Sequence, residues 1–143
     1  MLRKLTVIIS LFLFGTYLAA QIYDPVTWDF SFEKKGDKLY ELIFTASIAE
    51  HSHIYSMDIP EGGPIPTSFR FDTIPGFNLK GSTFEVTKPV ELLDEAFGIK
   101  IKTFSNKAEF RQKITAVGSS FTVTGAVNFM ACNNVTCSPP KDV

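Results

Sequence analysis

The stretch Asn128-Phe-Met-Ala-Cys-Asn-Asn-Val-Thr-Cys-Ser-Pro-Pro140 contains both cysteines of the 143-residue chain, Cys132 and Cys137. Four residues separate them, two prolines follow closely, and a β-like run from Ser120 to Met130 leads into them. If the cysteines flank a tight turn, their α-carbons can approach to about 5.5–6 Å, which suits a disulfide. We therefore expect a cysteine hairpin at one tip of a β-sandwich.

The small size of the ring argues against a purely structural bond. Cys132 to Cys137 spans six residues, and loop entropy gives a ring of that size only about 2 kcal/mol of stabilisation. Such a spacing fits a bond that is opened in use better than a bond that holds the fold together. Spacing alone nevertheless leaves three alternatives open, which are a structural disulfide, a redox pair and a metal site. With a structural disulfide, the chain would be a redox-inactive β-sandwich module that binds a periplasmic protein.

The metal alternative combines the two thiols with a His-x-His segment. Two thiolates and two imidazoles could hold zinc tetrahedrally, and a thioether would suit Cu(I). The candidate ligands are Cys132, Cys137, His51, His53, Met57 and Met130. A His-x-His pair on a strand more often lies at the surface or in packing, so we predict no metal ion and no cofactor. The sequence also lacks the Gly-x-Ser-x-Gly motif of a serine hydrolase.

The first twenty residues have the layout of a secretory signal peptide. A short basic start, Met1–Lys4, is followed by an apolar run, Leu5–Leu18, and by two small residues, Ala19-Ala20. The apolar run is short for a spanning helix, which needs about 20 residues. An uncleaved anchor is the alternative. We expect export to the periplasm, where disulfides persist.

Cleavage after residue 20 leaves one domain, residues 21–143. The signal removes Arg3 and Lys4, so Lys+Arg falls from 14 to 12 against 15 Asp+Glu, which gives a net charge of −3. Such a balance does not suit a nucleic-acid partner. We also expect no stable membrane span after cleavage.

Strand signals dominate the remainder of the chain. The alternating or β-branched runs are Thr27–Glu33, Leu39–Ala49, His51–Met57, Thr67–Asp72, Phe77–Thr87, Ile99–Phe104, Ala108–Val117 and Ser120–Met130. Ile59–Pro66 is a loop rich in Pro and Gly, and Pro89–Gly98 reads as irregular, with a helical turn at Glu91–Ala96. About seven to nine short strands predict an immunoglobulin-like antiparallel β-sandwich. An up-and-down barrel is the alternative.

The Cys-x4-Cys-x-Pro-Pro segment, Cys132–Pro140, resembles the N-terminal periplasmic domain of DsbD, the bacterial transmembrane thiol:disulfide interchange protein. Four other segments resemble that family in the same order. Trp28–Phe32 is similar to its first strand, and His53–Tyr55 to an aromatic segment near its cysteines. Pro60–Thr67 is similar to a loop of one variant, and Asp94–Gly98 to the loop that caps the cysteines. The resemblance covers about residues 22–143.

The resemblance implies a protein-disulfide reductase that works by dithiol exchange at Cys132 and Cys137. Cys137 would attack and be attacked, and Cys132 would resolve the mixed disulfide. The partners it implies are a thioredoxin-like electron donor and periplasmic acceptors, either disulfide isomerases or cytochrome-maturation proteins. Tyr55 and Phe97 would shield the pair, and Asp94 and Glu95 would hold charge or relay protons near the sulfurs. The six residues that the resemblance places around the pair are His53, Tyr55, Asp94, Glu95, Ala96 and Phe97.

The chain departs from the family pattern in three ways. The cap aromatic falls on Ala96, with Phe97 beside it, and an aromatic of the neighbouring strand becomes His53, whose charge can change near neutral pH. The chain carries no transmembrane bundle and no thioredoxin-like segment. It also stops at Val143, where family domains continue into a closing strand. We therefore expect either a stand-alone relative or a truncated sequence.

Overall fold

The computed structural model describes residues 24–72, 75–95 and 98–143. These residues form β-strands and no helix, so none of them belongs to a helix that could cross a membrane. The strands are β1 (Val26–Lys34), β2 (Leu39–Ile48), β3 (Ser52–Tyr55), β4 (Ser68–Phe71), β5 (Phe77–Glu85), β6 (Val90–Asp94), β7 (Ile99–Phe104), β8 (Lys107–Ala116), β9 (Gly125–Phe129), β10 (Ala131–Asn133) and β11 (Lys141–Asp142).

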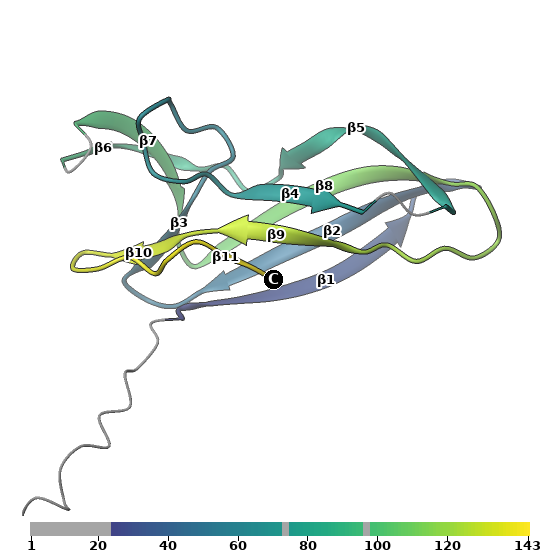
Figure 1. The fold of residues 1–143 in the computed structure, drawn as a ribbon, viewed down its shortest axis with the longest axis horizontal. Coiled ribbons are helices and arrows are strands. Elements are labelled where there is room, and N and C mark those ends of the chain that lie inside the picture. The colour runs from purple at the N-terminus through teal and green to yellow at the C-terminus, as the bar shows by residue number, and fades with distance from the viewer. Residues whose placement is uncertain (1–23, 73–74, 96–97) are drawn as a thin grey trace, which may run out of the picture.

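The strands form three antiparallel sheets, with the orders β1-β2-β8-β5, β10-β3-β7-β6 and β11-β9-β4. The strands β4 and β9 run across the first sheet (Figure 1). The β6–β7 hairpin projects from one end, as does the hairpin that begins with β10 (Ala131–Ser138, the β10 hairpin). β9 and β10 are separated by Met130 alone, so one stretch of chain passes from the third sheet into the second. This arrangement confirms the predicted all-β, immunoglobulin-like sandwich.

Aromatic side chains fill the main core between the first and third sheets. Alternate residues of β2 and β8 point inward, and Phe110 and Phe129 are fully buried. The Phe110 ring centroid lies 5.1 Å from that of Phe69 and 5.4 Å from that of Phe104, and the Trp28 centroid lies 5.4 Å from that of Phe129. Contacts of this kind add to the burial of large apolar area. The main core also includes Ala131 of β10, so it supports the base of the cysteine hairpin.

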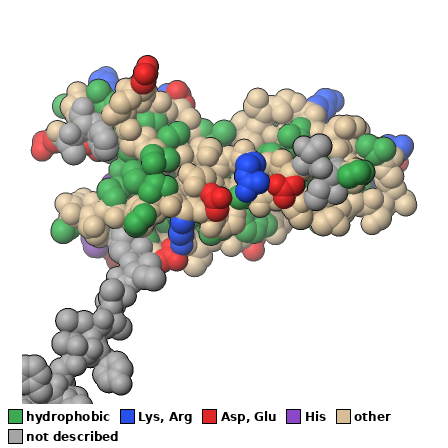
Figure 2. Space-filling view, viewed as in Figure 1, with side chains coloured by type: hydrophobic (Ala, Val, Ile, Leu, Met, Phe, Trp, Pro, Cys, Tyr) green, Lys and Arg blue, Asp and Glu red, His purple; other side chains and the backbone are tan. Residues whose placement is uncertain are grey.

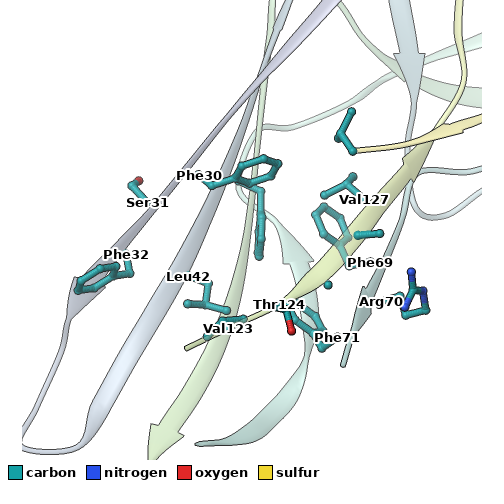
Figure 3. A pocket seen from close by; sticks show the side chains of 14 residues that line it. Phe30, Ser31, Phe32, Leu42, Phe69, Arg70, Phe71, Val123, Thr124 and Val127 are labelled. Atoms are coloured by element: carbon teal, nitrogen blue, oxygen red, sulfur yellow. The ribbon is translucent and has the colours of Figure 1, made fainter. Parts of the chain in front are cut away.

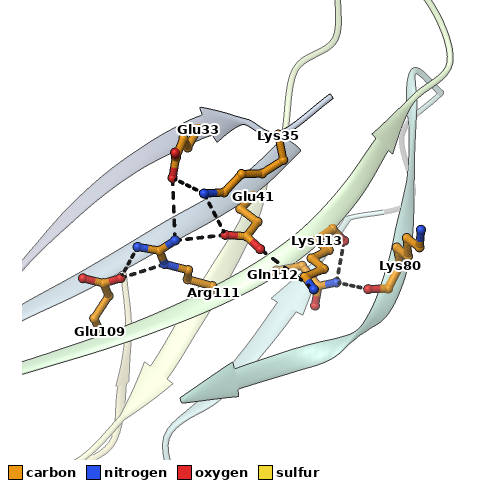
Figure 4. A network of polar contacts seen from close by, with 8 residues as sticks. All are labelled: Glu33, Lys35, Glu41, Lys80, Glu109, Arg111, Gln112 and Lys113. Carbon is orange, nitrogen blue, oxygen red and sulfur yellow. Dashed lines mark hydrogen bonds and ion pairs between the residues drawn. The ribbon is translucent and has the colours of Figure 1, made fainter. Parts of the chain in front are cut away.

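The outer face of β2 and β8 carries a charged network (Figure 4). The Arg111 guanidinium contacts Glu41 at 2.9 Å and Glu109 at 2.7 Å, and Lys35 contacts Glu33 at 2.7 Å. These partly exposed ion pairs each contribute little to stability, since solvent screens them. The charged side chains keep this outer face exposed to solvent. They belong to a different sheet from Cys132.

Gln112 fills a β-bulge on the inner side of the same sheet. The register between β5 and β8 shifts between Lys80 and Phe84, and an irregular ladder leaves backbone groups without strand partners. The buried Gln112 amide donates to the carbonyl oxygens of Gly81 and Lys113 and accepts a hydrogen bond from Thr83 at 2.9 Å. The Gln112 side chain thus provides hydrogen-bond partners for polar groups at the bulge.

An apolar groove of about 380 Å³ opens between β1 and the β4–β9 pair (Figure 3). Phe30, Phe32, Phe71 and Val123 are among the residues that line the groove. Arg70 is the one charged side chain in the described lining. Neither cysteine lines it, nor does any other residue that the sequence places at the site. The groove therefore offers apolar surface but no cluster of reactive groups.

Two sequence-based element predictions are wrong. Glu91–Ala96 was expected to form a helical turn, but β6 pairs antiparallel with β7 from Val90↔Thr103 to Asp94↔Ile99. Backbone pairing to β7 overrides the local helical preference of this Leu- and Glu-rich segment. The final run, expected from Ser120, forms strand only from Gly125, where pairing with β4 begins.

Candidate functional site

A disulfide joins Cys132 to Cys137 at the tip of the β10 hairpin. Their α-carbons lie 4.0 Å apart, closer than the 5.5–6 Å expected from the sequence. The reason is the backbone pairing: Asn133 N–H donates to Thr136 at 2.9 Å, and Ser138 N–H donates to Ala131 at 2.8 Å. The cysteines between these bonds form a non-hydrogen-bonded antiparallel pair, for which the usual Cα separation is about 4.5 Å.

Polar side chains at the two ends of the hairpin hold its shape. The Asn133 Oδ1 atom accepts hydrogen bonds from the N–H groups of Val135 and Thr136, both at 2.8 Å. This is an Asx-type turn, in which a side-chain oxygen replaces a backbone acceptor. At the other end, the Ser138 hydroxyl contacts both the N–H and the carbonyl oxygen of Ala131 at 3.2 Å. The loop between the cysteines is thus ordered by its own side chains.

The two cysteines differ in exposure. Cys132 is only 2% exposed and packs in a small cluster with Tyr55 and Ile101. Cys137, by contrast, is an exposed residue. Ile59, Ile99 and Met130 pack against this cluster from the side. A thiolate from another molecule therefore reaches Cys137 more easily than Cys132.

Tyr55, at the end of β3, contacts the buried sulfur directly. Its hydroxyl donates a hydrogen bond to Cys132 Sγ at 3.0 Å. The Tyr55 carbonyl accepts a hydrogen bond from the buried Thr67 hydroxyl at 2.6 Å, which fixes the end of the strand. Burial raises the pKa of Tyr55, and the negative charge of Asp94 raises it further. The hydroxyl therefore keeps its proton and remains a donor at neutral pH.

His53 lies opposite Cys132 in the register between β3 and β10. Its ring is perpendicular to that of Tyr55, with the centroids 5.3 Å apart. Burial lowers the pKa of this half-buried imidazole, and the negative charge of Asp94 opposes that shift. The neutral form is therefore favoured at neutral pH.

Asp94 ends β6 at the turn that leads into β7. Its carbonyl oxygen accepts a hydrogen bond from Gly98 N–H at 2.7 Å, and Gly98 has a φ of 67°, which suits glycine. Glu95 is exposed, while Ala96 and Phe97 lie outside the described residues. β6 and the β10 hairpin lie at the same end of the molecule, where hydrophobic side chains gather (Figure 2). The structure thus brings Asp94, His53 and Tyr55 together near the disulfide.

The residues of the metal alternative do not form a shared site. Within the described residues, no three His, Cys, Asp or Glu side chains lie close enough to hold a metal ion. The strand-like run His51–Met57 is shorter than expected, because β3 contains only Ser52–Tyr55. His51 has a φ of 62° in the preceding turn and an 83% exposed side chain beside Glu50, and Met57 packs on the main core.

The family description "Thiol:disulfide interchange protein DsbD, N-terminal" matches residues 20–143. The chain belongs to this family. The N-terminal periplasmic domain of ScsB from Proteus mirabilis is similar in structure, with a TM-score of 0.62 and 16% identity over 88% of this chain. The match covers 47% of that protein chain, so the present chain spans about half the length of this relative.

A second solved structure, the reduced DsbD N-terminal domain of Neisseria meningitidis, matches with a TM-score of 0.49. The identity is 17%, over 79% of this chain and 78% of that one. No curated protein sequence matches the chain. The structural likeness to ScsB supports the fold, and membership of the DsbD family supports thiol:disulfide interchange in general.

Sequence reasoning missed the residues that support the site from behind. Thr67 orients Tyr55, Ile101 packs beside Cys132, and Ser138 closes the hairpin. No local pattern marks Thr67 or Ile101, because their roles depend on contacts between distant segments. Asn133 did carry a signal, since an Asn beside a short loop commonly accepts backbone hydrogen bonds.

Proposed function

We propose that this chain is an exported thiol:disulfide interchange domain that passes reducing equivalents between periplasmic thiol proteins. The observation that carries the proposal is the difference between the two cysteines. Cys137 is exposed to an incoming thiolate, while Cys132 is buried and accepts a hydrogen bond from Tyr55 at 3.0 Å. Membership of the DsbD family supports the same chemistry.

In the reducing step, a thiolate of the electron donor attacks Cys137 Sγ. The disulfide breaks, a mixed disulfide forms at Cys137, and the electron pair passes to Cys132 Sγ. A charge on so buried a sulfur is costly unless it is hydrogen-bonded, and the Tyr55 hydroxyl supplies that bond. A second thiol of the donor then attacks the donor sulfur that is bonded to Cys137, and Cys137 is released. The donor leaves oxidised, and the domain is left as a dithiol.

The transfer to an acceptor runs through the same steps in reverse. The Cys137 thiolate attacks the acceptor disulfide, and Cys132 then attacks Cys137 Sγ to release the reduced acceptor. A thioredoxin-like protein is the proposed donor, and disulfide isomerases or cytochrome-maturation proteins are the proposed acceptors. Relative reduction potentials set the direction of flow. We also propose that four residues of the β6–β7 connection lie around the cysteine pair, with Phe97 as a shield: Asp94, Glu95, Ala96 and Phe97.

Single-cysteine variants test the assignment of Cys137. Reduced Cys132→Ala retains Cys137 and should form a mixed disulfide with oxidised glutathione, detected by mass spectrometry. Reduced Cys137→Ala retains only the buried sulfur and should react at least about 10-fold more slowly, since thiol exchange depends on access. Equal rates in the two variants would contradict the assignment. The wild-type dithiol is the control and should close to the Cys132–Cys137 disulfide while releasing reduced glutathione.

A further inference from the structure

The sulfur of Cys132 must gain and lose a proton in a place that water barely reaches. Cys132 is 2% exposed and lies against the buried side chains of Tyr55 and Ile101. If the pair exchanges as proposed above, this sulfur becomes a thiolate when Cys137 is attacked, and a thiol in the resting dithiol. Some group beside it must therefore carry the proton between the sulfur and solvent.

Two titratable groups of β3 lie beside this position, Tyr55 by its hydrogen bond and His53 by its register. A third, Asp94 at the end of β6, is close enough to both to act on them as a charge. Tyr55 holds its proton more firmly than usual, since burial raises its pKa. Asp94 acts on both neighbours as a negative charge. That leaves the imidazole of His53 as the candidate proton carrier, since histidine is the side chain whose unperturbed pKa lies between pH 5 and 8.

The position of His53 suits this task. It pairs directly with Cys132 across β3 and β10, and directly opposed residues have Cβ atoms about 4.5–5.5 Å apart on the same face of a sheet. Its ring rests at a right angle to the Tyr55 ring, 5.3 Å between centroids, which limits its orientations. His53 is half-buried, so it borders both the protein interior and solvent.

We propose that His53 carries the proton of Cys132 during exchange. As the disulfide breaks, the imidazolium of His53 gives its proton to the departing Cys132 thiolate, which leaves a thiol and a neutral imidazole. In the opposite direction the neutral imidazole takes the proton of the Cys132 thiol while that sulfur attacks Cys137 Sγ and the partner leaves as a thiolate. Asp94 keeps the charged imidazole accessible, and Tyr55 holds the sulfur in place.

The pH dependence of disulfide reduction by dithiothreitol tests this role. The single-turnover rate is divided by the concentration of dithiothreitol thiolate, which removes the titration of the reagent. For wild type, this normalised rate should fall as pH rises through the pKa of His53, which an NMR titration of the imidazole locates independently. For His53→Phe it should be flat and about 100-fold lower on the acidic side, at the low end of the contribution of general acid catalysis.

Two further variants separate a proton role from a packing role. His53→Gln keeps a polar side chain without a titrating proton, and it should behave like His53→Phe. His51→Phe changes the exposed histidine of the preceding turn, whose side chain is 83% exposed, and it should keep the wild-type profile. An unchanged profile in both His53 variants would overturn the proposal. So would a uniform loss of rate at every pH, since that result would mean packing alone.

The use of a small dithiol keeps this test apart from the proposed function. If His53 controls the profile but the domain fails to exchange with protein disulfides, the proton role stands and the interchange function fails. If the domain reduces protein acceptors but the His53 variants retain the wild-type profile, only the proton role fails.

Discussion

Tyr55 and Cys132 are separated by 77 positions in the sequence, and yet the Tyr55 hydroxyl lies 3.0 Å from Cys132 Sγ. In the proposed exchange this bond would help the buried sulfur to accept an electron pair, because a hydroxyl donor offsets part of the desolvation cost of a thiolate. Tyr55→Phe removes the donor while it keeps the ring. The substitution therefore tests the Tyr55 hydroxyl alone, because the aromatic ring still packs in the cluster.

We expect Tyr55→Phe to slow reduction of the disulfide by dithiothreitol about 10- to 100-fold, since a hydrogen bond to a charged group contributes about 1.5–3 kcal/mol. Stopped-flow measurement of reduction gives the rate. Tyr40→Phe is the matched control, because Tyr40 packs against Phe32 and Phe121 in another part of the molecule. A Tyr55→Phe rate equal to wild type would show that the bond does not assist the departing sulfur.

His53 should also make stability depend on pH. Burial lowers its pKa below the ordinary value of 6.5, so the unfolded chain binds a proton more readily than the folded one. The contribution of His53 is therefore fully present above about pH 6.5 and is lost as pH falls towards the lowered folded value. Urea unfolding between pH 7.5 and 5 should show a steeper decline for wild type than for His53→Phe. Parallel curves would contradict the shift.

At the scale of elements, alternation predicted most of the strands because one face of each packs on a core. The alternating burial of β8 from Lys107 to Ala116 is the clearest case. Periodicity failed at β6, where Val90, Leu92 and Leu93 remain exposed and leave no two-residue burial pattern. An edge strand of this kind is defined by its partner, which local sequence does not reveal. The same applies to β11, two residues paired with β9.

The β10 hairpin relies on Asn133, whose Oδ1 atom accepts two backbone hydrogen bonds. Asn133→Ala should lower the free energy of unfolding by about 1 kcal/mol, the usual net contribution of such bonds. Denaturant unfolding of the oxidised protein measures this loss. The exposed neighbour Asn134 provides the control, and Asn134→Ala should stay within about 0.5 kcal/mol of wild type. Equal effects of the two changes would contradict the proposed turn.

The pairing of β4 with β9 requires glycine at position 125. A Cβ atom there would lie 2.2 Å from the Arg70 carbonyl oxygen. Gly125→Ala should therefore force the strands apart and reduce the free energy of unfolding by roughly 1–3 kcal/mol. Gly36→Ala is the matched control, since its nearest contact would be the Leu39 Cβ at 3.5 Å. A Gly125→Ala protein as stable as wild type would rule out this close approach.

At the scale of the whole molecule, the scaffold and the reactive site have separate hydrophobic clusters. The main core contains Phe110 and Phe129, while Tyr55, Ile101 and Cys132 form a second, smaller cluster. Such a separation allows the chemistry around the sulfur to vary without loss of the sandwich. It also places the site at one end, where two hairpins reach beyond the core (Figure 1).

Sequence reasoning reached the fold class from strand patterns, and it reached the neighbours of the cysteines only through family resemblance. Spacing alone left the pair ambiguous, since a six-residue ring suits more than one use. The unequal burial of Cys132 and Cys137 could not be predicted, because it arises from packing of β3 and β7 against β10. That inequality is the feature on which the proposed mechanism depends.

The reduction potential of the Cys132–Cys137 pair distinguishes an exchange disulfide from a structural one. The protein is equilibrated with glutathione buffers of defined potential, and the fraction of dithiol is read by alkylation and mass spectrometry. We expect a potential above about −300 mV, within the range of about −120 to −270 mV in which exchange proteins operate. A value well below about −300 mV would mark a structural disulfide and rule out the proposed exchange.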